Sequence, residues 1–184
     1  LHGAYPYDVS KSAADLLAQA YFKTYGLPVA ITRSGNFYGG GDLYFDRIVP
    51  GTIKSLLFDE APIIRSDGRF VRDYIYIKDV ANAYMILAKK LKHVRGEAFN
   101  LSTEEPLDVL ALVGTISRLM GKQNLKPSVL NIVKAEIREQ YLSAEKARNL
   151  LGWSAKYSLR ESLKETIIWY KQYFGKKAEK KKQK

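Results

Sequence analysis

Two residues near the start of the chain have side chains and a spacing that suit proton transfer. Tyr7 and Lys11 stand four positions apart, so a helix through this segment places both side chains on one face. A phenol loses its proton at about pH 10 in water, and a neighbouring ammonium group stabilises the phenolate. The pair can therefore serve as a general base toward a hydroxyl group. On its own, the spacing also fits a half-buried tyrosine beside a surface lysine.

The elements that must position this pair follow from hydrophobic spacing and turn residues. Apolar residues recur at helical spacing over 10–25, and Gly26 follows where a C-cap glycine belongs. The uncharged run LPVAIT at 27–32 predicts a strand that is covered on both faces, as in a parallel sheet. A glycine-rich loop is expected over 34–44. The pair thus lies on a helix that leads directly into a buried strand.

The same signals predict the rest of the chain. We expect further helices over 47–58, 78–91, 107–120, 143–151 and 159–173. We expect further strands over 62–65, 70–74, 97–101 and 136–142. Trp153 and Trp169 are interpreted as core anchors. Strands that alternate with helices predict an α/β fold.

Composition excludes several kinds of protein. With 184 residues, 46% of them apolar, the chain can close the core of one ordinary domain. The absence of cysteine excludes disulfides and thiolate zinc sites, and two histidines are too few for a histidine metal site, so we expect no metal. No run approaches the roughly 18 apolar residues of a membrane helix, and no signal peptide is apparent. We therefore expect a cytoplasmic protein without a membrane partner.

The net charge of +11 is concentrated at one end. Residues 176–184 hold six lysines and one glutamate, whereas the first 175 residues hold 24 basic and 18 acidic side chains. We interpret the lysine run as a solvated, disordered tail. A basic nucleic-acid-binding module is the weakest alternative, because the 13 tyrosines are dispersed and no nucleic-acid-binding motif is present, and we expect no nucleic-acid partner.

Four longer segments carry a resemblance that the pair alone does not. They are YPYDVSKSAAD at 5–15, LPVAITRSGNFYGGGD at 27–42, RFVRDYIYIKDVANAY at 69–84 and QYLSAEKARNLLGW at 140–153. With them the chain resembles the extended short-chain dehydrogenase/reductases, the NAD-dependent nucleotide-sugar epimerases and dehydratases. Within that family it is most similar to the CDP-glucose 4,6-dehydratases.

The resemblance implies roles for particular side chains. Tyr7 would be the catalytic base that exchanges a proton with the sugar 4-hydroxyl, and Lys11 would hold the nicotinamide ribose of NAD. Asn36 would contact the diphosphate or sugar of the substrate. Arg72 would pair with the diphosphate, a task that suits a planar guanidinium with five donors.

Asn100 and Tyr141 fall where the family places contacts to the nucleotide. The implied reaction is oxidation of a nucleotide sugar at C4, elimination of water across C5 and C6, and return of the hydride to C6. A 4-epimerase or reductase that uses the same tyrosine and lysine is the alternative within the family.

The residues themselves leave simpler roles open. Asn36 also fits as a cap of the glycine-rich turn. Arg72 also fits as a surface partner of Asp73 or Asp79. We expect both carboxylates to be structural, with Asp79 in the first turn of a helix, where acidic groups are favoured.

The departures from the family pattern are equally informative. No G-x-G-x-x-G pattern occurs among the 13 glycines, and the upstream serine or threonine and the acidic pair of the dehydratases are missing as well. We therefore expect the C-terminal part of a Rossmann-type enzyme together with a small α/β substrate-binding domain, without the dinucleotide-fingerprint half. Segments 1–33 and 78–102 would contribute to the Rossmann sheet and its helices, and the rest of 1–175 would be mostly substrate domain.

Such a chain is expected to be inactive in isolation. We expect it to bind a nucleotide sugar and to form a homo-oligomer or to take up a complementary N-terminal chain. A non-catalytic nucleotide-sugar-binding fragment is the alternative from outside the enzyme class.

Overall fold

The computed structural model describes residues 5–133 and 137–182. The helices are α1 (Pro6–Tyr25), α2 (Ile48–Leu57), α3 (Ile77–Val94), α4 (Val109–Met120), a π-helical turn η1 (Ala147–Leu151) and α5 (Leu159–Lys182). The strands are β1 (Ile31–Ser34), β2 (Asn36–Tyr38), β3 (Ile63–Ile64), β4 (Val71–Arg72), β5 (Tyr74–Tyr76), β6 (Ala98–Leu101), β7 (Leu107–Asp108), β8 (Ser128–Val129) and β9 (Glu139–Gln140). The expected α/β composition is confirmed.

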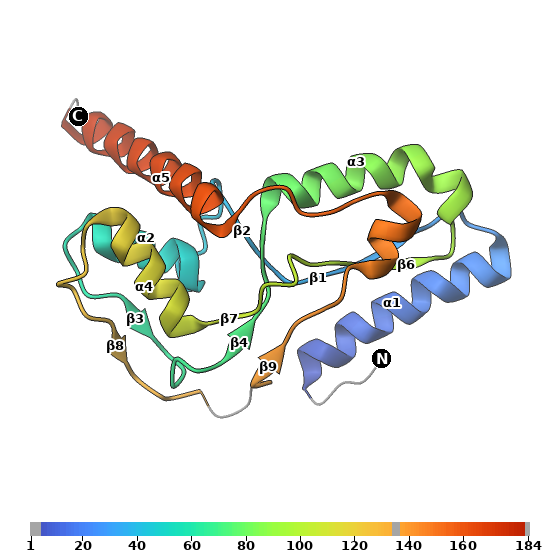
Figure 1. Cartoon of the computed structure of the whole chain (residues 1–184), viewed down its shortest axis with the longest axis horizontal. Helices are drawn as coiled ribbons and strands as arrows, with labels where there is room; N and C mark the ends of the chain where they lie inside the picture. The colour runs from blue at the N-terminus through green and yellow to red at the C-terminus, as the bar shows by residue number, and fades with distance from the viewer. Residues whose placement is uncertain (1–4, 134–136, 183–184) are drawn as a thin grey trace.

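The first region is built on a parallel pair of strands. β1 pairs with β6 in parallel, from Ile31 opposite Ala98 to Ser34 opposite Leu101. α1 and α3 lie on opposite sides of this pair (Figure 1). The predicted parallel strand is confirmed, although it lies over 31–34 rather than 27–32, and its residues are half-buried instead of covered on both faces. The core of this first region contains mainly aliphatic and aromatic side chains: Ile75, Val80, Leu87, Phe99, Leu101, Leu151 and Trp153.

The second region is a group of three helices, α2, α4 and α5, drawn together at the other end of the molecule (Figure 1). Their buried side chains form a separate cluster that includes Ile53, Leu56, Leu112, Ile116, Leu163 and Tyr170. Trp153 is fully buried in the first region, as expected, whereas Trp169 is only partly buried against the second cluster. The assignment of 1–33 and 78–102 to a dinucleotide-binding sheet stays a prediction, which the pairing of β1 with β6 supports.

Short strands connect the two regions. β2 pairs in parallel with β5, and β4 lies between β7, which is antiparallel to it, and β9, which is parallel. β3 pairs with β8. The sequence interpretation missed β2, β7 and β8, because strands of two or three residues carry too little alternation to be recognised.

Helix ends differ from the prediction for local reasons. α1 begins at Pro6 rather than at residue 10, because a proline at the first helical position loses no hydrogen bond. Gly26 ends this helix in the left-handed conformation with φ of 67°, as predicted. Asp108 caps α4 by accepting a hydrogen bond from the Ala111 backbone N–H at 2.7 Å, so that helix starts at Val109 instead of residue 107.

The C-terminal end also differs from the expectation. α5 continues to Lys182, so helical backbone runs through 176–182, where we expected a disordered tail, and residues 183–184 lie outside the described residues. The predicted strand at 136–142 is shorter, Glu139–Gln140, and its first position lies outside the described residues as well. Across the described ranges, none of the helices combines the length and apolar character that crossing a bilayer would require.

Candidate active site

Tyr7 and Lys11 lie on one face of the first turns of α1, as their spacing predicts. The Lys11 Nζ is 5.4 Å from the centroid of the Tyr7 ring. The Tyr7 side chain is 70% exposed, and among the described residues neither side chain has a hydrogen-bond or ion-pair partner. The Ser10 hydroxyl donates to the Tyr7 backbone carbonyl at 2.7 Å. Phenol and ammonium are therefore both available to a ligand.

Three of the predicted substrate contacts meet in one small pocket. Asn36, Arg72 and Tyr141 line a cavity of about 30 Å³. Its other lining residues are Ser34, Gly35, Asp73, Gln140 and Leu142. This volume accommodates roughly two water-sized groups, so only one small polar part of a larger ligand would fit inside it. Three separate segments of the sequence, 34–36, 72–73 and 140–142, supply its wall.

Strand pairing brings these segments together. Asn36 opens β2, and its backbone N–H donates to the Asp73 carbonyl at 2.6 Å. Arg72 on β4 stands opposite Gln140 on β9, and Tyr141 is the next residue after that strand. The sheet register therefore determines which side chains share the pocket. That register is invisible in the sequence, which is why Gln140 was missed.

Arg72 is buried, with only 6% of its surface exposed. Its guanidinium donates to the carbonyls of Val71 at 2.8 Å and Arg138 at 3.1 Å, and lies 5.4 Å from the centroid of the Phe70 ring. These contacts fix the plane of the cation at the pocket wall. A fixed planar cation is suited to a phosphate group.

The carboxylates that we considered as partners of Arg72 have other contacts. One Asp73 carboxylate oxygen accepts hydrogen bonds from the Thr103 hydroxyl at 3.0 Å and the Thr103 N–H at 3.4 Å. Asp79, in the first turn of α3, accepts the backbone N–H groups of Lys156 at 2.9 Å and Tyr157 at 3.3 Å. The contacts of Asp79 are structural, as predicted. Asp73 also lines the pocket, and its second carboxylate oxygen, Oδ2, is buried without a hydrogen-bond partner among the described residues, so a purely structural role for Asp73 stays a prediction.

Asn100 does not line the pocket. Its side-chain amide donates to the Ser143 carbonyl at 3.1 Å, two residues beyond Tyr141. Tyr141 is 56% exposed, so this bond anchors the segment that presents the tyrosine to solvent. The structure thus places Asn100 where it supports the site rather than where it lines the cavity.

Gly35 is required by the close approach of two backbones, a feature that the sequence interpretation did not identify. A Cβ added at Gly35 would lie 2.5 Å from the Asp73 carbonyl oxygen and 2.9 Å from the Asp73 Cβ and Cγ. Only a residue without a side chain lets the start of β2 approach this wall so closely.

We expect Gly35→Ala to separate β2 from β5, lowering the free energy of unfolding by about 1–3 kcal/mol through overpacking. The matched control is Gly114→Ala in α4, where an added Cβ has no neighbour within 4 Å. This change should stabilise the fold by about 0.5–1 kcal/mol, as alanine does in a helix interior. Urea unfolding of both variants tests the pair. Equal stability of the two would contradict the packing argument.

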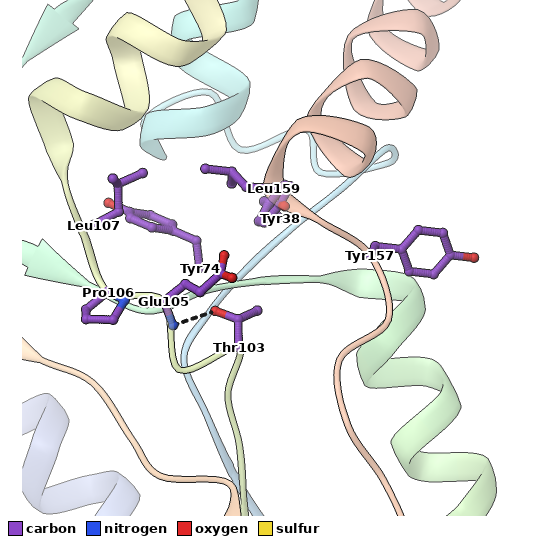
Figure 2. Close-up of a pocket in the computed structure, with 8 residues that line it drawn as sticks. All are labelled: Tyr38, Tyr74, Thr103, Glu105, Pro106, Leu107, Tyr157 and Leu159. Atoms are coloured by element: carbon purple, nitrogen blue, oxygen red, sulfur yellow. Dashed lines mark hydrogen bonds between the residues drawn. The ribbon is translucent and has the colours of Figure 1, made fainter.

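A larger cavity of about 110 Å³ lies elsewhere (Figure 2). Its lining is mainly aromatic and apolar: Tyr38, Tyr74, Thr103, Glu105, Pro106, Leu107, Tyr157 and Leu159. Burial raises the pKa of Tyr38 to about 12, and the Tyr38 hydroxyl is 2.5 Å from the Ser162 hydroxyl oxygen. Such a phenol does not exchange protons near neutral pH. None of the six residues singled out from the sequence lines this cavity. Asn36, Arg72 and Tyr141 line the smaller pocket, whereas Tyr7, Lys11 and Asn100 line neither.

No group of three or more His, Cys, Asp or Glu side chains within 5–133 and 137–176 is arranged to hold a metal ion. What the described residues offer is a tyrosine–lysine pair on a helix and an arginine–asparagine pocket at the ends of parallel strands. This combination defines the class of extended short-chain dehydrogenase/reductases.

Comparison with known proteins supports that class. Residues 2–102 match the NAD dependent epimerase/dehydratase family. The chain belongs to this family.

Three individual proteins illustrate how similar this chain is to members of the family. A dTDP-D-glucose 4,6-dehydratase from Bos taurus is 33% identical over 175 residues, which cover 92% of this chain and 48% of the relative. A dTDP-glucose 4,6-dehydratase from Bacillus anthracis, solved in complex with NAD, has a TM-score of 0.85 and 31% identity over 94% of this chain and 54% of that one. A UDP-glucose 4-epimerase from Thermotoga maritima, solved with UDP-glucose, has a TM-score of 0.87 and 29% identity over 94% and 55%.

The chain spans about half the length of the curated relatives it matches. The family and the fold expected from the sequence are therefore confirmed. These relatives are named for dTDP- and UDP-sugars, and both dehydratases and 4-epimerases are among them.

Proposed function

We propose that this chain supplies the catalytic base and the diphosphate-binding wall of an NAD-dependent nucleotide-sugar dehydratase or 4-epimerase. The observation that carries the proposal is the pocket in which Arg72, Asn36 and Tyr141 meet. A buried guanidinium beside an amide and a phenol matches the charge and hydrogen-bonding needs of a nucleotide diphosphate.

The side chains divide the work between binding and proton transfer. Arg72 and Asn36 bind the diphosphate end of the substrate, and Tyr141 contacts the nucleotide. Tyr7, as phenolate, accepts the proton of the sugar 4-hydroxyl, and the Lys11 ammonium stabilises that phenolate. A positioned tyrosine and lysine thus perform the acid–base part of the reaction.

The same lysine suits the family's cofactor. Lys11 has no ion-pair partner among the described residues, so its three N–H donors are free to bind ribose hydroxyl groups. NAD, when bound, supplies hydride transfer at the sugar carbon. In this division, Lys11 holds the ribose while Tyr7 moves the proton.

Turnover is best measured in a complemented enzyme. We define this as the chain preceded by the N-terminal half of the Bacillus anthracis dehydratase. The sugar product, identified by NMR, distinguishes elimination of water from epimerisation at C4. CDP-glucose is the substrate favoured by the sequence resemblance, and competition against dTDP-glucose and UDP-glucose tests this preference.

Binding tests the diphosphate wall directly. Arg72→Ala should weaken nucleotide-sugar binding by about 2 kcal/mol or more, roughly 30-fold, because the phosphate charge loses its buried partner. The matched control is Arg69→Ala, which removes an exposed arginine three residues away and should leave the Kd unchanged. Calorimetric titration of both variants with CDP-, dTDP- and UDP-glucose gives the comparison. An unchanged Kd for Arg72→Ala, in a variant that still unfolds cooperatively, would refute the assignment.

A further inference from the structure

Asp15 is an unusual residue in α1. Of the twenty residues of this helix, all of them described, Asp15 alone is buried, with 8% of its surface exposed. Several large apolar residues of the helix, such as Leu16 and Leu17, are exposed instead, and Phe22 is only partly buried. Hydrophobic burial within the described chain therefore does little to hold α1 in place, and a carboxylate occupies the inward position.

That carboxylate is fully engaged by two partners. The Arg33 Nε donates to Asp15 Oδ2 at 2.7 Å, and the second guanidinium donor reaches Oδ1 at 3.1 Å. The Gln19 amide donates to Oδ1 at 2.6 Å. The hydrogen bond from Arg33 is the main reason that the pKa of Asp15 is lowered, so the pair is charged at neutral pH. Two parallel bonds from one guanidinium fix orientation as well as distance.

The ion pair joins the two parts of the candidate site. On the helix, Lys11, Asp15 and Gln19 follow one another at intervals of four, on the stripe that begins with Tyr7. On the strand, Arg33 stands opposite Asn100 and is followed three residues later by Asn36 at the pocket. The Asp15 carboxylate therefore connects the proton-transfer pair to the strand that forms the substrate-binding wall.

A second contact holds the far end of α1. The Phe22 ring packs so closely over Gly96 that a Cβ there would overlap the ring. Tyr7 lies fifteen residues from Phe22, about 22 Å along a helix axis, so a tilt of about 5° around that contact moves Tyr7 by about 2 Å. A displacement of about 1 Å is enough to cost roughly 100-fold in rate. A second fixed point between Phe22 and Tyr7 is needed, and Asp15 occupies it.

The geometry points to Asp15 and Arg33 as positioning residues, which fix the angle of α1 so that Tyr7 and Lys11 face the pocket wall. This inference rests on the proposed function, because it assigns the ion pair a purpose in that reaction. It predicts that breaking the pair misplaces the base while the substrate wall itself stays intact.

The first test measures position without any activity. The chain has no cysteine, so nitroxide labels introduced at Val9→Cys on α1 and Lys89→Cys on α3, both exposed, report one distance distribution by pulsed electron resonance. Asp15→Asn and Arg33→Gln should each broaden this distribution at least twofold. The double variant should broaden it no further, since one interaction is lost in all three.

The matched control is Glu97→Gln, which removes the 2.6 Å ion pair between Glu97, just before β6, and Lys146, and it should leave the distribution unchanged. If Arg33→Gln does not fold, Arg33→Lys keeps the charge without the two-pronged geometry and should broaden the distribution to a smaller extent. Distributions unchanged by every folded Asp15 or Arg33 variant would overturn the inference.

The second test separates positioning from stability in the complemented enzyme. Asp15→Asn should lower kcat at least tenfold per folded molecule, change KM for the nucleotide sugar less than threefold, and raise the isotope effect of a substrate deuterated at C4. An isotope effect does not depend on the folded fraction. Loss of kcat explained by unfolding alone, with the isotope effect unchanged, would refute positioning.

The same assay with Tyr7→Phe distinguishes failure of the positioning inference from failure of the proposed function. If Tyr7→Phe is inactive while the Asp15 and Arg33 variants are fully active, positioning is refuted and the proposed function stands. If Tyr7→Phe is fully active, the proposed function itself is refuted.

Discussion

Tyr7→Phe is expected to reduce turnover of the complemented enzyme by about 100-fold or more, the usual scale for loss of a positioned acid or base. Phenylalanine keeps the ring but removes the phenol oxygen that we propose as the acceptor of the sugar hydroxyl proton. Because Arg72 and Asn36 form a separate pocket that Tyr7 does not line, the substrate Kd should change little. Loss of kcat with KM preserved is the signature of an interaction made in the transition state.

The control for this prediction lies on the same helix. Tyr25→Phe removes the hydroxyl of another exposed tyrosine, whose ring packs 5.4 Å from that of Tyr21, and it should leave kcat unchanged. Lys11→Met should lower kcat as well, because the phenolate loses its neighbouring cation. Steady-state kinetics on the three variants gives the comparison. A fully active Tyr7→Phe enzyme would remove the catalytic assignment.

Local chemistry could be predicted from the sequence where a few adjacent residues determine it. The spacing of Tyr7 and Lys11 placed them on one helical face, Gly26 ended the helix, and the run before Arg33 indicated a parallel strand, although that strand is only half-buried. Each of these depends on interactions within a few residues, so no distant partner has to be known.

The parts that could not be predicted depend on register between distant segments. Gln140 reaches the pocket because β9 pairs with β4, and Asn100 binds the Ser143 carbonyl because the chain returns there after 43 residues. The ion pair between Asp15 and Arg33 was missed for the same reason, although both residues lie in segments that carry the family resemblance. The sequence indicates which side chains are able to bind a ligand or transfer a proton. The pairing of distant segments determines which of these side chains lie together.

The way this chain assembles is predicted from the surfaces that the fold leaves open. Within the described residues, β1 pairs on one side with β6, and no other strand adjoins its second edge. Beside it, α1 exposes Leu16, Leu17 and Tyr21. An unpaired strand edge next to an apolar helix face is an association site.

We therefore expect the chain to self-associate, with an apparent mass that rises with concentration. When the N-terminal half of the Bacillus anthracis dehydratase is supplied, the particles should become smaller and more uniform in mass. Leu16→Glu with Leu17→Glu should suppress self-association by placing charge on the helix face, whereas Met85→Glu, at an equally exposed position of α3, should not. The complemented enzyme should also turn over a nucleotide sugar with NAD, whereas the chain alone should not, because no G-x-G-x-x-G segment is present to hold the cofactor diphosphate. Light scattering across a dilution series, with and without the added half, measures self-association. Product formation measures turnover. A compact monomer at high concentration that unfolds cooperatively would show that the open edge and the helix face need no partner.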